Sequence, residues 1–237
     1  MMANKMQAMI LEWKEKAQDR NKVLQDLEVY RQVSAMDEAE KRRVSGIHDA
    51  IQKIPLRYQH KQWADFTVEH EDQRKIKTIM QRYANTYKDR MIQGNNVIFT
   101  GNYGTGKTLL SLIIYQQLVK AGFSCAYEPS LDFLRSLQEK KFAAAGVFNN
   151  AMAFYQHISF LIIDEVTEGG GKNRSLTDWE SELLFKLINL RYQQQRCTLV
   201  ISNRNRENLR NCLGERIYDR LADKGIPLAF NWKSYRQ

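Results

Sequence analysis

Cysteine and histidine are scarce in this sequence. The only cysteines among the 237 residues are Cys125, Cys197 and Cys212, and no two of them form a Cys-x-x-Cys pair. The four histidines are equally scattered. A disulfide framework or a zinc site is therefore not expected, and we expect the thiols to be reduced and mostly buried.

Long apolar runs are also missing. No apolar stretch approaches the roughly 20 residues that a membrane-spanning helix requires. The first ten residues hold no compact apolar run behind a basic start. We therefore expect no signal peptide and no membrane partner, and we place the protein in the cytoplasm. The length suits one α/β domain with a smaller appendage.

Acidic residues are outnumbered by basic ones. The chain holds 27 Asp and Glu against 36 Lys and Arg, which gives a formal net charge of +9. Such an excess suits a polyanionic partner such as nucleic acid. Charge alone does not establish that partner, because many basic proteins bind no nucleic acid.

Residues 1–45 lack proline and glycine and carry a helical pattern. Met6, Trp13 and Leu24 belong to an apolar stripe at helical spacing, and charges of both signs fill the other positions. The stripe needs a partner, which is this chain's own body, a second copy or another protein. Gly46 then opens a predicted break, so we divide the chain into a helical arm at 1–45, a linker at 46–70 and a main domain at 71–237.

The main domain alternates helices with short apolar strands. Helices are predicted at 71–90, 108–119, 131–141, 178–195 and 206–222, and strands at 97–100, 124–127, 160–163, 198–201 and 227–232. Continuous apolar strands between helices predict an α/β fold in which helices cover both faces of a parallel sheet.

A phosphate-binding motif follows the first of these strands. The pattern G-x-x-x-x-G-K-[ST] is matched by Gly101, Asn102, Tyr103, Gly104, Thr105, Gly106, Lys107 and Thr108. Its glycines let successive backbone N–H groups point inward at a phosphate on the helix N-terminus. Lys107 supplies a cation for the β- and γ-phosphates, and Thr108 supplies a hydroxyl ligand for Mg²⁺. ATP and Mg²⁺ are therefore the expected cofactors.

Polar residues follow two later strands. Asp164 ends the strand at 160–163, and parallel sheets present their ligands at carboxyl strand ends, so Asp164 is expected to help hold Mg²⁺. Glu165 comes next and is placed to orient or deprotonate an attacking water. Asn203 lies just past the strand at 198–201, where its amide would touch the γ-phosphate or that water; the alternative is an ordinary turn residue.

Two segments resemble a known family. Gly-Glu-Arg-Ile-Tyr-Asp-Arg-Leu at 214–221, followed by Phe-Asn-Trp-Lys-Ser-Tyr-Arg at 230–236, resembles the C-terminus of the DnaC family of bacterial and phage replicative helicase loaders. Ile-Pro-Leu-Arg-Tyr at 54–58, with Phe66, resembles the start of that family's ATPase domain. The resemblance covers roughly 46–236. Its C-terminal motif is fairly specific, whereas every AAA+ protein shares the phosphate motifs.

This resemblance implies an AAA+ P-loop ATPase whose site is shared between neighbouring subunits. Arg216 would be the arginine finger that reaches ATP on the adjacent subunit, and Arg220 would be a second sensing arginine. Their spacing puts both on one helix face. The alternative is that they pair with nearby carboxylates at Glu215, Asp219 or Asp223. Only 12 residues follow Gly225, so we expect no helical C-terminal lid, as in the family.

Candidate DNA contacts combine aromatic and basic residues. Phe142 follows two lysines, and Trp179 follows a glycine-containing basic loop at 168–174. Aromatic faces beside basic side chains suit single-stranded DNA, although core or helix packing is an alternative for each ring.

The leading functional hypothesis is ATP-dependent loading of a hexameric replicative DNA helicase onto single-stranded DNA, with the arm at 1–45 binding the helicase. A second is an ATPase of the IstB type that assists a transposase on duplex DNA. A third is a binding adaptor that ATP switches, with incidental hydrolysis.

Overall fold

The computed structural model describes residues 38–166 and 176–236. The chain divides into two compact units, Met1–Gly46 and Ile47–Gln237. Most of the predicted arm at 1–45 lies outside the described residues. Its described part belongs to helix α2, Glu38–Gln52.

Helix α2 corrects one expectation, because it continues through Gly46 and ends at Gln52. A glycine inside a helix costs only about 1 kcal/mol relative to alanine. Ile47 and Ala50, in the turns that follow, pack against the core of the second unit. That burial offsets the cost. The helix therefore does not end at Gly46, as predicted, but at Gln52, before Pro55.

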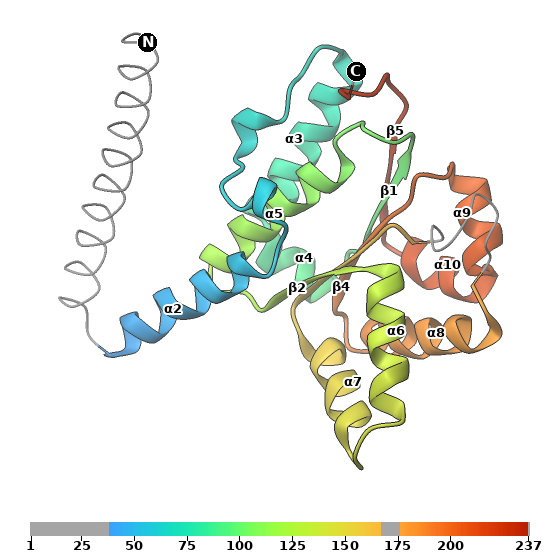
Figure 1. Cartoon of the computed structure of the whole chain (residues 1–237). Helices are drawn as coiled ribbons and strands as arrows, with labels where there is room; N and C mark the ends of the chain where they lie inside the picture. Colours follow the sequence, from blue (N-terminus) through green and yellow to red (C-terminus); the bar gives the residue numbers. More distant parts are fainter. Residues whose placement is uncertain (1–37, 167–175, 237) are drawn as a thin grey trace, which may run out of the picture. The chain divides into compact units, whose positions relative to one another are not determined.

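The second unit is built on a five-stranded sheet (Figure 1). Its strands are β1 Val97–Gly101, β2 Cys125–Pro129, β3 Phe160–Asp164, β4 Cys197–Ile201 and β5 Ile226–Phe230. Their order is β2-β3-β4-β1-β5, and all neighbouring pairs are parallel. The predicted parallel sheet is confirmed, with each strand shifted by at most a few residues.

Helices precede the first strand and connect the others. They are α3 Glu71–Asn85, α4 Tyr87–Gln93, α5 Lys107–Lys120, α6 Ser130–Lys141, α7 Val147–His157, α8 Asp178–Gln193, α9 Arg206–Leu213 and α10 Glu215–Ala222. Short 3₁₀ turns at Leu56–Tyr58 and Trp63–Asp65 precede α3. The helix predicted at 71–90 is divided between α3 and α4, and α7 was not predicted. No described helix has the length and apolarity needed to cross a membrane.

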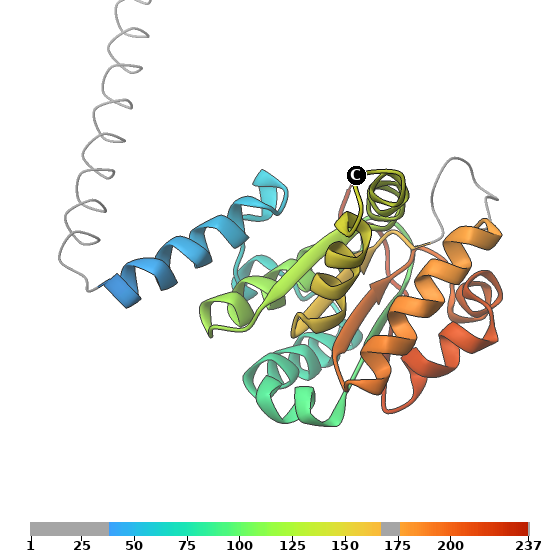
Figure 2. The same ribbon diagram turned by 90° about the horizontal axis from the view of Figure 1, so that it is seen from below.

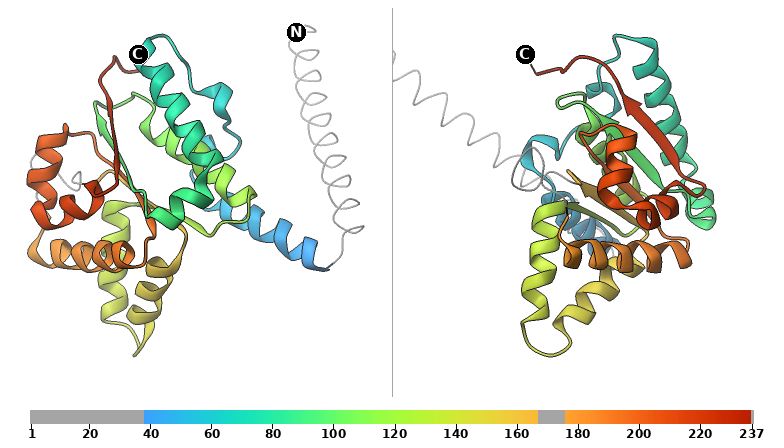
Figure 3. Two further views of the ribbon diagram at one scale, coloured as in Figure 1. Left: turned by 180° about the vertical axis from the view of Figure 1, so that it is seen from behind. Right: turned by 90° about the vertical axis from the view of Figure 1, so that its right-hand side faces the viewer.

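Alternating strand side chains feed two hydrophobic cores. In β3, Phe160 and Ile162 pack into the core covered by α3, α4 and α5, whereas Leu161 and Ile163 pack into the core covered by α6 to α10. This period of two is what a strand buried on both faces requires. The result is a sheet between two helical layers (Figures 2 and 3).

The strand order positions the site. β4 lies between β3 and β1 in the sheet, although it follows both in sequence. The segments that leave the carboxyl ends of these three strands therefore lie side by side. They carry Asp164, Asn203 and the P-loop at 101–108.

Candidate nucleotide-binding site

The P-loop curls around its own lysine. Lys107 is the first residue of α5 and only 4% exposed. Its Nζ donates to the carbonyl oxygens of Gly101 at 2.7 Å and Asn102 at 2.6 Å. The ammonium is thus held inside the loop. A phosphate seated on the N-terminus of α5 would gain this cation as well as the inward N–H groups.

Asp164 and Thr108 meet at the end of β3. The Thr108 hydroxyl donates to Asp164 Oδ2 at 2.8 Å. The Tyr127 hydroxyl donates to the same oxygen at 2.9 Å, and the Glu165 amide donates to Oδ1 at 2.8 Å. A hydroxyl and a carboxylate are the hard oxygen ligands that Mg²⁺ prefers. The donor set fits a magnesium ion next to the phosphates, with Thr108 and Asp164 as its protein ligands.

Burial shapes the electrostatics of Asp164, which is only 2% exposed. Desolvation raises the pKa of its carboxyl above the ordinary value of 3.8. The hydrogen bonds from Thr108, Tyr127 and the Glu165 amide act in the opposite direction because they favour the carboxylate. A divalent cation would also favour the carboxylate. A cation bound beside Asp164 would therefore stabilise the buried carboxylate, whose charge is costly in the absence of a partner.

Glu165 and Asn203 line the cleft beside the P-loop. Glu165 is exposed and has a φ of 55°, in the left-handed region that non-glycine residues rarely adopt. Such strained positions gather at functional sites. Nearby, the Gly101 amide donates to the Arg204 carbonyl at 3.2 Å, which ties the P-loop to the segment after β4.

The structure brings most predicted site residues into one cleft. Its volume is about 190 Å³, and its lining includes Tyr58, Gly104, Lys107, Thr108, Glu165, Asn203, Tyr235 and Arg236. Asp164 adjoins it through the bond to Thr108. A partly polar cleft on a helix N-terminus suits a nucleotide.

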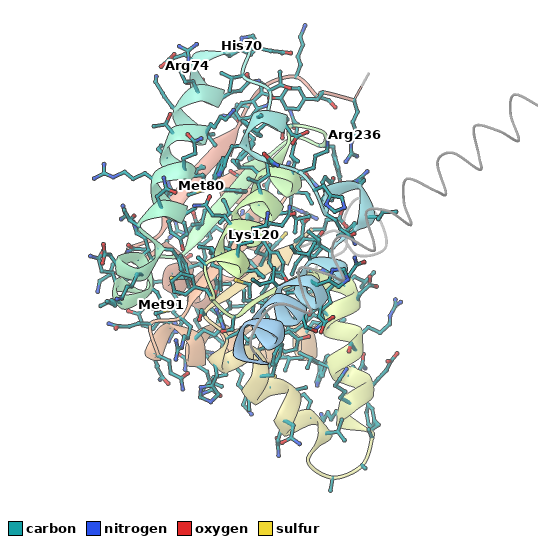
Figure 4. All side chains as sticks on the ribbon, turned by 90° about the vertical axis from the view of Figure 1, so that its left-hand side faces the viewer. His70, Arg74, Met80, Met91, Lys120 and Arg236 are labelled. Atoms are coloured by element: carbon teal, nitrogen blue, oxygen red, sulfur yellow. The ribbon has the colours of Figure 1, made fainter. Side chains whose placement is uncertain are left out.

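The C-terminal tail at 231–236 forms one wall of this cleft. The Tyr235 amide donates to the Gly104 carbonyl at 2.8 Å, and Trp232 Nε1 donates to the Thr105 carbonyl at 3.1 Å. The Tyr235 hydroxyl also reaches the Thr67 carbonyl at 2.9 Å. Figure 4 labels Arg236 on this tail, toward the end of the unit where His70 precedes α3.

Sequence reasoning did not assign a site role to this tail or to Tyr127. Residues 230–236 entered the sequence-based prediction only through the family resemblance. That resemblance was also the one sequence feature that could have pointed to Arg236. Tyr127 carries no local signal, because its link to Asp164 depends on the pairing of β2 with β3.

Arg216 and Arg220 lie on α10 and do not line the cleft. Their guanidinium carbons lie 3.9 Å and 4.9 Å from the centroid of the Phe185 ring on α8. Among the residues that the structure describes, neither arginine forms an ion pair with Glu215, Asp219 or Asp223. Glu215 forms an ion pair with Arg210, and Asp223 accepts from the Tyr192 hydroxyl.

The two candidate DNA-contacting rings differ in exposure. Phe142 is 80% exposed just after α6, so core packing does not apply to it. Trp179 is partly buried against the core, and Lys141 Nζ lies 5.9 Å from its ring centroid. Lys141 therefore precedes one candidate ring, Phe142, in the sequence and contacts the other, Trp179, in space. The loop at 168–174 lies wholly within a segment, 167–175, that is outside the described residues.

Curated relatives cover most of the chain. The replicative helicase loader DnaC of Buchnera aphidicola subsp. Schizaphis graminum is 27% identical over 182 residues, 76% of this chain and 71% of that protein. The protein of the same name from Escherichia coli strain K12 is 25% identical over 180 residues, 76% of this chain and 70% of that protein.

Solved structures share the fold. A crystal structure of the DnaC helicase loader has a TM-score of 0.64 at 18% identity and covers 74% of this chain and 99% of its own. The replication initiator DnaA bound to AMPPCP and single-stranded DNA has a TM-score of 0.61 at 21% identity, covering 76% of this chain and 51% of its own. At these identities the likeness establishes the AAA+ P-loop fold.

The comparison that covers the chain most fully is with a family model. The model described as IstB-like ATP binding protein matches residues 3–237, which include both phosphate motifs and the C-terminal tail. This chain belongs to the family of IstB-like ATP binding proteins.

Proposed function

We propose that this protein is an ATP-dependent loader of a hexameric replicative DNA helicase onto single-stranded DNA during replication initiation. The observation that carries the proposal is the similarity to replicative helicase loaders over 76% of the chain. It is supported by a cleft that the P-loop, Glu165 and Asn203 line, with Asp164 bonded to Thr108 beside it.

Within that cleft each residue has a proposed task. The P-loop and Lys107 bind the phosphates of ATP, while Thr108 and Asp164 hold Mg²⁺. Glu165 orients or deprotonates the attacking water, and Asn203 contacts the γ-phosphate or that water. Arg236 lines the same cleft and adds a cation near the phosphates.

Arg216 acts in trans, on ATP bound by a neighbouring copy. Its position on α10, outside the cleft of its own chain, supports this assignment. A guanidinium supplied from outside stabilises the negative charge that develops during phosphoryl transfer. Arg220 is the proposed second sensing arginine of the same helix.

Mixing two inactive variants tests the shared site. Lys107→Ala should abolish ATP binding in a fluorescence titration, because the phosphates lose their main side-chain cation. Arg216→Ala should bind ATP normally but lose stimulated hydrolysis. A mixture of the two should regain some hydrolysis, since intact phosphate sites then face intact arginines. Failure to regain activity under assembling conditions would assign Arg216 a surface role or a role in cis.

The helicase is proposed to bind the arm at 1–45. Methionine and tryptophan on an apolar stripe are adaptable, large-area side chains that suit a partner groove. Deleting 1–45 should leave a protein that binds ATP and single-stranded DNA but does not capture the helicase. Trp13→Ala should weaken capture by roughly 2 kcal/mol if this side chain is a central anchor. Normal capture by the deletion variant would place the helicase-binding surface elsewhere.

A second candidate function is assistance to a transposase on duplex DNA. The family description itself favours it, because the matching model is named for IstB-like proteins. Co-purification separates the two proposals. Capture of the replicative helicase supports the loader, whereas capture of a transposase with preference for duplex DNA supports the alternative.

A further inference from the structure

One aromatic ring contacts both arginines of α10. The Phe185 centroid lies 3.9 Å from the guanidinium carbon of Arg216 and 4.9 Å from that of Arg220. The ring comes from α8, so it connects two helices. At these distances both cations are attracted by the negative face of the ring.

The ring is a fixed platform. Phe185 is partly buried and packs against the core on this face of the sheet. Helix α8 begins with a capping box, in which Thr177 accepts from the Glu180 amide and the Glu180 carboxylate accepts from the Thr177 amide. Leu184 and Leu187, which precede and follow Phe185 in the sequence, are buried and anchor the same helix in the core.

The two arginines are engaged differently. Arg220 Nε donates to Asn189 Oδ1 at 2.7 Å, and its NH1 donates to the Arg216 carbonyl at 2.8 Å. Two of its donors are therefore used inside the chain. Arg216 is exposed, and no carboxylate within 38–166 or 176–236 pairs with it.

Stacking leaves Arg216 ready to bind a phosphate. A guanidinium that rests by its face on a ring keeps its N–H donors in the plane, at the edge. Those donors suit bidentate contact with phosphate oxygens. Because the ring restricts the side chain beforehand, less conformational entropy is lost when the contact forms.

We propose that Phe185 is a positioning residue, which holds the Arg216 guanidinium in the orientation that reaches ATP on a neighbouring copy. Arg220, bonded to Asn189 and to the Arg216 carbonyl, braces the same part of α10 against α8. This inference rests on the proposed sharing of the ATP site between subunits.

A directional mixing experiment tests it. In the mixture of Lys107→Ala and Arg216→Ala proteins, the first supplies the arginine and the second supplies the phosphate site. Adding Phe185→Leu to the Lys107→Ala copy should lower kcat of the mixture by about tenfold, which lies within the range for a cation–π contact. Adding it to the Arg216→Ala copy should change kcat by less than about twofold, because that copy's arginine is already absent. The KM for ATP should stay unchanged in both mixtures.

Phe185→Tyr is the matched control: it keeps the ring, so in either copy the mixture should hydrolyse ATP at the parent rate. Equal losses from both placements of Phe185→Leu would show that the ring only maintains the fold, and no loss from either would show that it does not orient Arg216. Either result overturns the positioning role while the shared site stands. If the parent mixture itself does not hydrolyse ATP, the shared site fails and the positioning role fails with it.

Discussion

The hydroxyl of Thr108 and Oδ2 of Asp164 are joined by a 2.8 Å hydrogen bond between the first turn of α5 and the end of β3. Two proposed Mg²⁺ ligands from distant parts of the sequence are thus already in contact. Thr108→Val should lower Mg²⁺-dependent ATP hydrolysis by about tenfold or more, because valine has a similar shape but no hydroxyl. Thr108→Ser keeps the hydroxyl and should remain within about threefold of the parent rate. Undiminished hydrolysis by Thr108→Val across a Mg²⁺ titration would remove Thr108 from the site.

Asp164 should give the protein a measurable pH dependence of stability. Burial raises the pKa of this carboxyl in the folded state above 3.8. Between the unfolded-state pKa, near 3.8, and the higher folded-state pKa, the folded state binds more protons than the unfolded state. The free energy of unfolding therefore falls as pH rises through this window. Asp164→Asn removes this contribution. Denaturant unfolding at several pH values should show the variant gaining relative stability from about pH 4 upwards; a difference that does not change with pH would contradict the prediction.

A change at Glu165 should affect ATP hydrolysis without affecting ATP binding. Glu165→Gln should bind ATP as the parent does but hydrolyse it about a hundredfold more slowly, because the carboxylate that acts on water is lost. Glu182→Gln, an exposed site on α8, is the matched control and should behave as the parent. Helicase loading that continues at the parent rate in Glu165→Gln would favour an adaptor that ATP only switches.

Gly104 lies beneath the C-terminal tail. Its φ is 73°, and a Cβ added there would lie 1.9 Å from Ser234 Oγ. Gly104→Ala should therefore displace the tail and weaken ATP binding. Gly122→Ala is the control, since Gly122 also has a positive φ, 88°, but nothing within 4 Å of an added Cβ. Both changes should cost about 1 kcal/mol of stability, and only the first should lower ATP affinity. Equal ATP affinities would show that the tail does not shape the site.

The exposed ring of Phe142 should contribute to single-stranded DNA binding. Phe142→Ala should weaken binding by about 1–3 kcal/mol without changing its salt dependence, because stacking releases no counterions. Trp179→Ala should act in the same sense. Lys141→Ala should instead reduce the salt slope by about one. Tyr192→Ala, an exposed ring at the other end of α8, should have no effect. Equal preference for duplex DNA would favour the transposition alternative.

The parallel sheet was predictable because its strands are short, continuous apolar runs that contrast with the helices around them. Helix α7 was not, because its sequence is rich in asparagine and aromatic residues that favour helices weakly. Helix α7 is instead stabilised by a residue of α8: the buried Arg191 donates to the carbonyls of Tyr155 and Ile158, at the C-terminal end of α7. Such tertiary support leaves no local pattern in the helix itself.

The site divides in the same way. Lys107, Thr108 and Asp164 were found because the phosphate motifs are contiguous and follow predicted strands. Tyr127 and Arg236 were not assigned to the site, since their places depend on strand order and on where the tail passes. A helix through Gly46 was missed for the related reason that packing by Ile47 outweighs the local cost of glycine.

The position of β1 between β4 and β5 also has a consequence for biosynthesis. Residues 97–101 pair with 226–230, and the P-loop is bonded to the tail that follows. On the ribosome these partners emerge long after the P-loop itself. Such non-local pairing makes folding slow and leaves the unpaired edge of β1 exposed on the nascent chain. Competence to bind ATP should therefore arise only after residues 226–236 have left the ribosome, long after the P-loop itself has been made.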